Sequence, residues 1–229
     1  APSGTYTLND AFSTSASGQF TLNNGTFDAN NFNVTADRFN ISGTTIRGLT
    51  MGTGTWTSTS TGTVTVWSNA TTTNLTFSGA SSIFVVSGAG TANRIFAGGG
   101  LTYGTLTFTV AGSTGLLDIT GSNTFSTINF SDITNARTLR FTAATTTTVT
   151  TFNVNGTSGK NMTVTSVTAA THTLTSSVQQ SVDFLTISYS IVNASPKWYA
   201  GANSTDSGNN TNWIFTAPPG PVVANAGFL

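Results

Sequence analysis

The 229-residue chain contains no cysteine and no glutamate, one histidine, and few charged side chains of either sign. Without cysteine it cannot form a disulfide scaffold, a thiolate zinc site or a thiol nucleophile. The single His172 excludes a multi-histidine metal site within one chain. Seven basic residues balance seven acidic ones, so the formal net charge is zero. This balance excludes a basic nucleic-acid binder and a polybasic membrane-surface protein.

Long hydrophobic runs and helix-forming residues are also scarce. No run of about 18 apolar residues occurs, so the sequence predicts no membrane-spanning helix. Good helix formers such as Glu, Lys, Gln and Leu are few, and no stretch places apolar residues at the helical period. Thr, Val, Ile and Phe dominate, with Gly and Asn between short runs. This composition predicts an all-β chain.

The expected strands are short runs in which apolar and polar residues alternate, which puts the apolar side chains on one face. They are bounded by Gly, Asn or Ser, which suit tight corners. The runs are 20–22, 32–34, 39–41, 64–66, 75–77, 83–85, 106–108, 116–119, 128–130, 139–141, 152–154 and 162–164.

The spacing of the apolar residues indicates stacked coils. Three series recur at intervals of 22 to 24 residues: Leu101, Phe125 and Val149; Phe108, Phe130 and Val154; Ile119, Phe141 and Val164. Three parallel series with one common period predict a β-solenoid (β-helix) with three short strands in each coil. The alternative is a β-sandwich or jelly roll, in which strands also recur at short intervals.

The shortage of charge fits a stack of coils. Equivalent residues of successive coils lie about 4.8 Å apart, so a column of like charges would repel itself. Columns of Thr, Ser and Asn can instead form hydrogen bonds between neighbours. The low charge is therefore an expected consequence of stacking.

The pattern of residue types along the sequence changes near residue 176. Residues 1–175 are predicted to form the β-solenoid repeats and residues 176–216 a C-terminal capping β segment. Within this segment, residues 182–189 have the pattern of a longer alternating strand. Residues 217–229 are predicted to form a proline-rich tail or arm.

The capping segment holds the strongest candidates for ligand contact. Trp198, Tyr199 and Trp213 either form an aromatic platform that stacks on a glycan or plug the coil end as hydrophobic core. Asp206 and Asn203 supply oxygen ligands of the kind that Ca²⁺ takes, but a dedicated site usually has several carboxylates. A loop rich in Asx turns explains the same pattern, so no metal site is predicted.

The tryptophans of the N-terminal half leave two interpretations open. Trp56 and Trp67 either lie on an exposed face or are buried at a subunit interface.

No group of residues has the pattern of a catalytic site. Asp118 and Asp132 are 14 residues apart, less than one repeat, so they need not share a face. Asp28 and Asp37 suit either a shared coil edge or the capping of turns. His172 lies in a segment with the residue pattern of an ordinary strand, and no serine lies in a nucleophile-elbow motif. The chain is therefore predicted to be no enzyme, with no catalytic residue and no cofactor.

Several segments of the C-terminal half resemble a terminal module that recurs in proteins of bacteriophages and environmental viruses. The segments are 123–125, 145–148, 153–159, 182–187 and 198–215. The resemblance implies a secreted or virion-exposed β-repeat protein of tail fibres, spikes or other surface appendages. It implies no catalytic residues.

These observations predict a structural virion protein, a module of a phage tail fibre, spike or capsid-surface appendage. Its expected location is the virion surface or the extracellular space. Its expected partners are further copies of itself, with a trimer favoured, other virion proteins and a host-surface glycan, but neither nucleic acid nor a membrane. The alternatives are a subunit of a cellular extracellular filament or adhesin with the same coil, and a solenoid enzyme that degrades polysaccharides.

Overall fold

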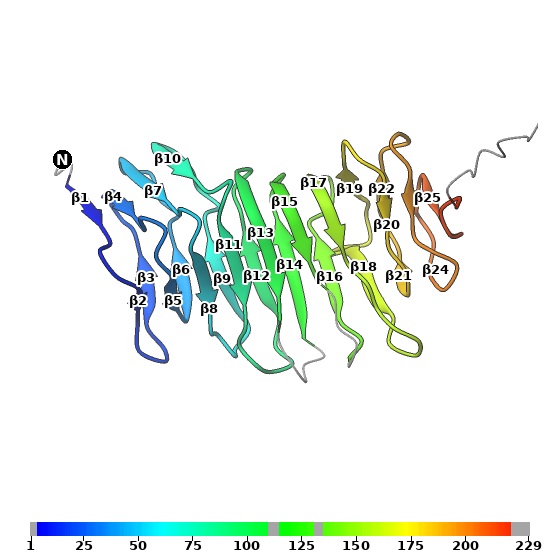
Figure 1. Ribbon diagram of the computed structural model, residues 1–229, viewed down its shortest axis with the longest axis horizontal. Coiled ribbons are helices and arrows are strands. Elements are labelled where there is room, and N and C mark those ends of the chain that lie inside the picture. Colours follow the sequence, from blue (N-terminus) through cyan, green and yellow to red (C-terminus); the bar gives the residue numbers. More distant parts are fainter. Residues whose placement is uncertain (1–3, 110–114, 131–134, 221–229) are drawn as a thin grey trace, which may run out of the picture.

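The chain folds into a β-solenoid of about nine turns, whose coils follow one another along the long axis of the molecule (Figure 1). The computed structural model describes residues 4–109, 115–130 and 135–220. These residues form 25 strands and no helix, and every pairing between the named strands is parallel. The predicted β-solenoid is confirmed, because a sandwich or jelly roll is built from antiparallel strands.

Two sheets of nine strands run along the molecule. Sheet B contains β2 (Phe12–Ser13), β5 (Val34–Ala36), β8 (Thr55–Ser58), β11 (Ile83–Val86), β13 (Thr102–Phe108), β15 (Thr124–Asn129), β17 (Thr146–Asn153), β19 (His172–Thr175) and β22 (Ser190–Val192). Sheet C contains β3 (Gln19–Thr21), β6 (Arg38–Asn40), β9 (Val64–Ser68), β12 (Arg94–Ala97), β14 (Leu116–Thr120), β16 (Thr138–Phe141), β18 (Met162–Ser166), β21 (Leu185–Ile187) and β24 (Thr205–Asp206).

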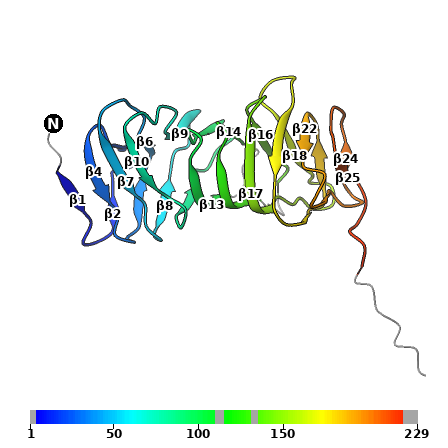
Figure 2. The ribbon, with the colours of Figure 1, turned by 90° about the horizontal axis from the view of Figure 1, so that it is seen from above.

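Two shorter sheets complete the coils at opposite ends of the molecule (Figure 2). Sheet A contains β1 (Thr5–Thr7), β4 (Gly25–Asp28), β7 (Arg47–Thr50) and β10 (Leu75–Ser78). Sheet D contains β20 (Gln180–Ser181), β23 (Trp198–Tyr199) and β25 (Trp213–Ile214). Strands of sheet A precede those of sheet B in each coil, whereas strands of sheet D come between sheets B and C.

The prediction of three strands in each coil is therefore wrong for the middle of the molecule. From β13 to β18 each coil has two strands, because sheet A ends at β10 and sheet D has not begun. The seven-residue β13 runs past the end of sheet A, and the amide of Gly104 donates to the carbonyl of Gly79 at 2.9 Å. A Cβ at Gly104 would lie 2.2 Å from the carbonyl oxygen of Ser82, so this close approach requires glycine.

The register between coils confirms one predicted series and corrects two. Phe108 and Phe130 stack with ring centroids 5.0 Å apart, and the pairing of Asn129 with Asn153 continues this series to Val154. Phe125 and Val149 are paired, but Phe125 faces Tyr103 rather than Leu101. In the third series Ile119 pairs with Phe141, whereas Val164 pairs with Leu139.

These register errors have a common cause in the corner loops. The coil length varies from 15 residues, between Trp198 and Trp213, to 30 residues, between Val64 and Arg94. Strand pairing fixes which residues lie opposite each other, but it does not fix the length of the loop between two strands. A loop that gains or loses two residues therefore changes the repeat length seen in the sequence, although the strands stay paired in the same register.

The predicted long strand at 182–189 is also wrong. Only Leu185–Ile187 is extended, as β21. Phe184 and Tyr189 have φ angles of 56° and 53°, in the left-handed region, and interrupt the strand on both sides. After residue 176 the chain still adds strands to sheets B and C and forms sheet D. The division at residue 176 itself stays a prediction.

The coil interior is packed with aromatic rings. Trp56 and Trp67 are fully buried and meet at right angles, with ring centroids 6.0 Å apart. The indole nitrogen of Trp67 donates to the hydroxyl of Tyr103, which donates to the carbonyl of Gly98. Both tryptophans therefore belong to the core of the coil, which is neither of the two predicted placements. Among the described residues there is no helix that could cross a membrane.

Candidate functional site

The three aromatic residues predicted to contact a glycan lie at the C-terminal end of the core. Trp198 is fully buried, and Tyr199 and Trp213 are 9% and 8% exposed. The rings of Trp198 and Trp213 meet at 73° with centroids 5.3 Å apart, and Phe152 lies against Trp198. The indole nitrogens donate to Asn193 and Ser190. This is the plug arrangement, which leaves no open ring face on which a sugar could stack.

Asn203 and Asp206, the predicted oxygen ligands, each bind a different partner. The backbone and side-chain nitrogens of Asn203 donate to the carboxylate of Asp183, at 3.0 and 2.7 Å. The carboxylate of Asp206 accepts from the amide of Gly208 and the side chain of Asn210. Both carboxylates cap turns. Within the part of the chain that the structure describes, no three His, Cys, Asp or Glu side chains are grouped as a metal site would need.

Asp118 is bound by an arginine of the next coil. It lies on β14 directly opposite Arg140, whose Nε and Nη2 donate to its two oxygens at 2.6 and 2.8 Å. Asn93 donates to the same carboxylate at 2.9 Å. Among the described residues, Asp118 and Arg140 are the only charged side chains that lie directly opposite each other on adjacent coils, and their charges are of opposite sign. Asp132, which the sequence did not require to share a face with Asp118, lies outside the described residues.

Asp28 and Asp37 lie at different corners and are occupied locally. Asp28 accepts from the backbone amide of Asn30 at 2.8 Å, at the end of sheet A. Asp37 lies between sheets B and C, 3.6 Å from Arg38. Asp28 therefore caps its turn, whereas Asp37 faces its neighbour Arg38, and the two carboxylates lie at different corners of the coil.

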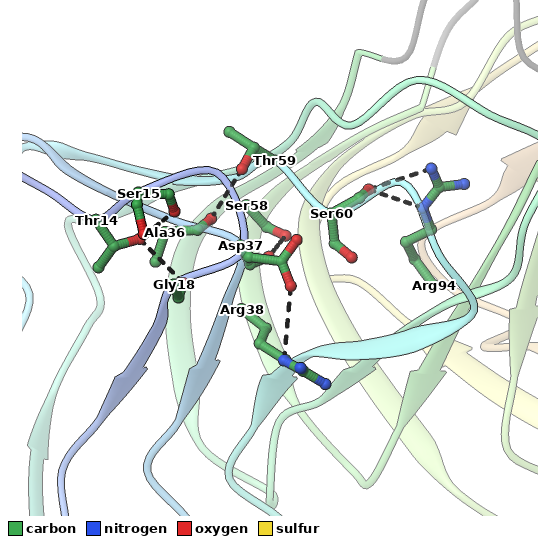
Figure 3. A network of polar contacts seen from close by, with 10 residues as sticks. All are labelled: Thr14, Ser15, Gly18, Ala36, Asp37, Arg38, Ser58, Thr59, Ser60 and Arg94. Atoms are coloured by element: carbon green, nitrogen blue, oxygen red, sulfur yellow. Dashed lines mark hydrogen bonds and ion pairs between the residues drawn. The ribbon is translucent and has the colours of Figure 1, made fainter.

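Polar contacts hold the corner between sheets B and C through several successive coils (Figure 3). Ser58 donates to the carbonyl of Asp37, one coil away, at 2.6 Å. Arg94 is fully buried and donates to the carbonyls of Ser60, Gly88 and Ala92, at distances from 2.6 to 3.3 Å. Burial lowers the pKa of Arg94 from its ordinary value. The guanidinium ties two corner loops together.

Arg47 does the same at the corner that leads into sheet A. Arg47 is 2% exposed, and its guanidinium donates to the carbonyls of Ile41, Thr45, Thr71 and Thr73. Burial lowers its pKa too. Several carbonyl dipoles, rather than a carboxylate, therefore surround each of these buried charges.

His172 is a buried, stacked residue. Its Nδ1 lies 2.8 Å from the hydroxyl of Ser166, and its ring stacks on Phe141 at 4.8 Å. Burial lowers its pKa to about 4, so the ring is neutral near pH 7. Its Nε2 has no hydrogen-bond partner among the described residues. The Ser–His pair is closed to solvent and does not form an accessible nucleophile.

The surface feature that sequence reasoning missed is a groove of about 420 Å³ on the outer face of sheet B, here called the sheet B groove. Its floor comes from β13, β15 and β17, and its wall from the loop around β20. Every lining residue is uncharged: Thr105, Thr127, Asn129, Thr150, Thr151, Phe152, Asn153, Val178, Gln179, Gln180 and Ser181.

The floor of the groove is a regular array. Thr105, Thr127 and Thr151 are paired in register, one on each coil. Asn129 and Asn153 form a second column, in which the side-chain nitrogen of Asn153 donates to the side-chain oxygen of Asn129 at 2.9 Å. Polar side chains of adjacent coils therefore repeat at the strand spacing, about 4.8 Å.

The wall is fixed to the floor by Gln180. Its side-chain oxygen accepts from the amide of Phe152 at 2.8 Å, and its nitrogen donates to the carbonyl of Thr150 at 2.9 Å. The buried amide group takes the place of a backbone peptide beside β17. The sequence shows only two adjacent glutamines, and the structure is needed to see that Gln180 is buried and Gln179 exposed.

No family model, curated protein or solved structure matches this chain.

Proposed function

We propose that the chain is a structural module of an extended surface appendage: a phage tail fibre, a spike or a capsid-surface protein on the virion. The observation that carries the proposal is the continuous parallel stack, in which sheets B and C pass through nine strands each. A solenoid of this kind is a rod in which every coil contacts its neighbours, which suits an element that holds other parts at a distance.

The neutral surface supports the same proposal. Outward columns of Thr and Asn need no counter-charge, and Asp118 of sheet C is paired with Arg140 of the next coil. Hydrogen bonds between neutral groups are less sensitive to salt than ion pairs are. A module built in this way keeps its stability in the changing media around an exposed particle.

The proposal includes self-association, with a trimer as the expected state, and contact with other virion proteins. Large apolar side chains at the surface of the N-terminal half support it: Tyr6 is 62%, Ile46 72% and Ile83 38% exposed. Burial of such side chains between copies would be favourable. Sedimentation analysis of the purified chain should give a trimer, and a stable monomer in dilute solution would contradict this part of the proposal.

The location is tested by finding the chain in its native setting. The gene should lie among genes for capsid and tail proteins, and antibodies against the chain should label the surface of purified particles in electron micrographs. Genes for secretion and labelling of cell envelopes instead would show a cellular filament or adhesin. Shortening of a polysaccharide by the purified chain would overturn a purely structural role.

A further inference from the structure

We infer that the sheet B groove binds an uncharged polysaccharide chain, laid across the coils along the solenoid axis. The inference rests on the proposed function in one respect, because an exposed appendage must present the groove to a surface. Its physical basis is the lining of the groove, its regular floor and its fixed wall.

The lining matches the chemistry of a neutral sugar. Hydroxyl and amide groups of Thr, Asn, Gln and Ser both donate and accept hydrogen bonds, as sugar hydroxyls do. No lining residue carries a charge. An acidic glycan or a nucleic acid would need Lys or Arg to balance its negative charge, so the groove favours an uncharged ligand.

The floor matches a ligand that repeats. Thr105, Thr127 and Thr151 present the same hydroxyl from three successive coils, and Asn129 and Asn153 add amides beside them. A linear polymer that lies parallel to the solenoid axis meets equivalent groups as it passes from coil to coil. A ligand that lay along the strands would meet alternately outward and buried residues, because Leu106 and Ile128 point inward.

The wall supplies an apolar contact that is already in place. Val178 is 46% exposed and stands beside the polar floor, where it can cover the C–H face of a sugar ring. The hydrogen bonds of Gln180 to Phe152 and Thr150 hold this wall against β17. A wall that is ordered before binding costs little conformational entropy when the ligand arrives.

A second copy of the chain fits the groove less well. The core of a protein interface is enriched in aromatic and apolar side chains. In the groove the aromatic Phe152 is 2% exposed, and Val178 is the exposed apolar residue of the lining. A protein partner would therefore find mostly hydroxyls and amides, whereas a polysaccharide finds complementary groups throughout.

The test is affinity electrophoresis of the full chain in gels that contain dextran, mannan or a soluble β-glucan, with alginate as the acidic comparison. Retardation is expected in at least one neutral gel and not in alginate. Thr127→Val should weaken the interaction about fivefold, which corresponds to one lost hydrogen bond. Thr127→Arg should abolish it by filling the groove.

The matched controls are Thr57→Val and Thr57→Arg. Thr57 is also an outward, half-buried threonine of sheet B, but it lies outside the groove. Both control variants should bind like the natural chain, and thermal unfolding should show all four variants folded.

Three outcomes would overturn the inference: no retardation in any neutral gel, stronger retardation in alginate, or equal behaviour of the Thr127 and Thr57 variants. Loss of self-association in Thr127→Arg alone would also overturn it, because the groove would then be a contact between copies. None of these results changes the labelling of particles, so a failure of this inference is distinct from a failure of the proposed function.

Discussion

At the scale of single residues, the main chain satisfies most of the buried polar side chains. The guanidinium groups of Arg47 and Arg94 donate to loop carbonyls. The side-chain amide of Gln180 accepts a hydrogen bond from the backbone N–H of Phe152 and donates one to the carbonyl of Thr150. His172 differs, since its Nε2 finds no hydrogen-bond partner in the part of the chain that the structure describes. A buried polar group without a partner costs free energy, and its protonation would cost more.

His172 should make the stability depend on pH. Its pKa is about 4 in the folded chain and about 6.5 when unfolded, so the unfolded chain binds the proton first. Stability should fall as the pH drops below about 6.5, by about 3 kcal/mol in total, and the loss is complete below about pH 4.

Urea unfolding between pH 7.5 and 3.5 measures this effect, with His172→Leu as the reference. The two proteins differ only at residue 172, so the difference between them isolates the histidine, which is the only one in the chain. Parallel stability curves of the two proteins would contradict the prediction.

Arg94 should contribute strongly to stability through its corner. Arg94→Met leaves the carbonyls of Ser60, Gly88 and Ala92 without their donors, so we expect a loss of about 3 kcal/mol. Arg38→Met is the control, because the Arg38 side chain is 44% exposed at an earlier turn of the same corner and should change the stability by at most about 0.5 kcal/mol. Denaturant midpoints of the two variants give the comparison, and equal losses would refute the role assigned to Arg94.

At the scale of elements, the corner loops rather than the strands account for the irregularities of the coil. Most of the expected strands place their apolar residues in or against the core. The expected strand 83–85 faces the other way, since Phe84 is buried and Ile83 is 38% exposed. The register could not be predicted from spacing, since Tyr103 rather than Leu101 faces Phe125. Both residues are apolar in character and two positions apart, so alternation alone gives them the same face.

Gln180 should control the wall of the sheet B groove. In Gln180→Ala the amide of Phe152 and the carbonyl of Thr150 lose their partners, so the unfolding free energy should fall by about 2 kcal/mol. Hydrogen exchange at the Phe152 amide should accelerate. Gln179→Ala removes the exposed neighbour and should change neither quantity measurably. Unchanged protection at Phe152 in Gln180→Ala would contradict this account of the wall.

At the scale of the whole molecule, the solenoid is a one-dimensional stack. Each coil pairs with the coil before and the coil after it, and strands farther apart in the order of a sheet are not paired. The stability of such a structure is close to a sum of coil and interface contributions. The coils in the middle have two described neighbours, whereas those at the two ends of the stack have one.

This arrangement predicts a gradient of local stability along the axis. Backbone amides in β1 to β3 and in β24 and β25 should exchange fastest, and those in β13 to β17 slowest, because the end coils can open without disturbing the middle. Hydrogen exchange of the intact chain, read by mass spectrometry of peptides, measures the gradient. Uniform protection along the chain would show instead that all coils open in a single step.

The class of fold and the character of the surface follow from the amino-acid sequence alone. Apolar residues that recur in short alternating runs define strands with one buried face, and the scarcity of charge leaves neutral columns as the outward face of a stack. Both properties are local in sequence, so they can be recognised without knowledge of the pairing.

Packing between the coils sets the number of strands in each coil, the burial of the tryptophans and the position of the sheet B groove. These features depend on contacts between residues one or more coils apart, such as Gln180 with Thr150 or Trp198 with Phe152. The lengths of the corner loops, which vary from coil to coil, decide which residues meet. The energy of each contact then depends on geometry that no local pattern of residues contains.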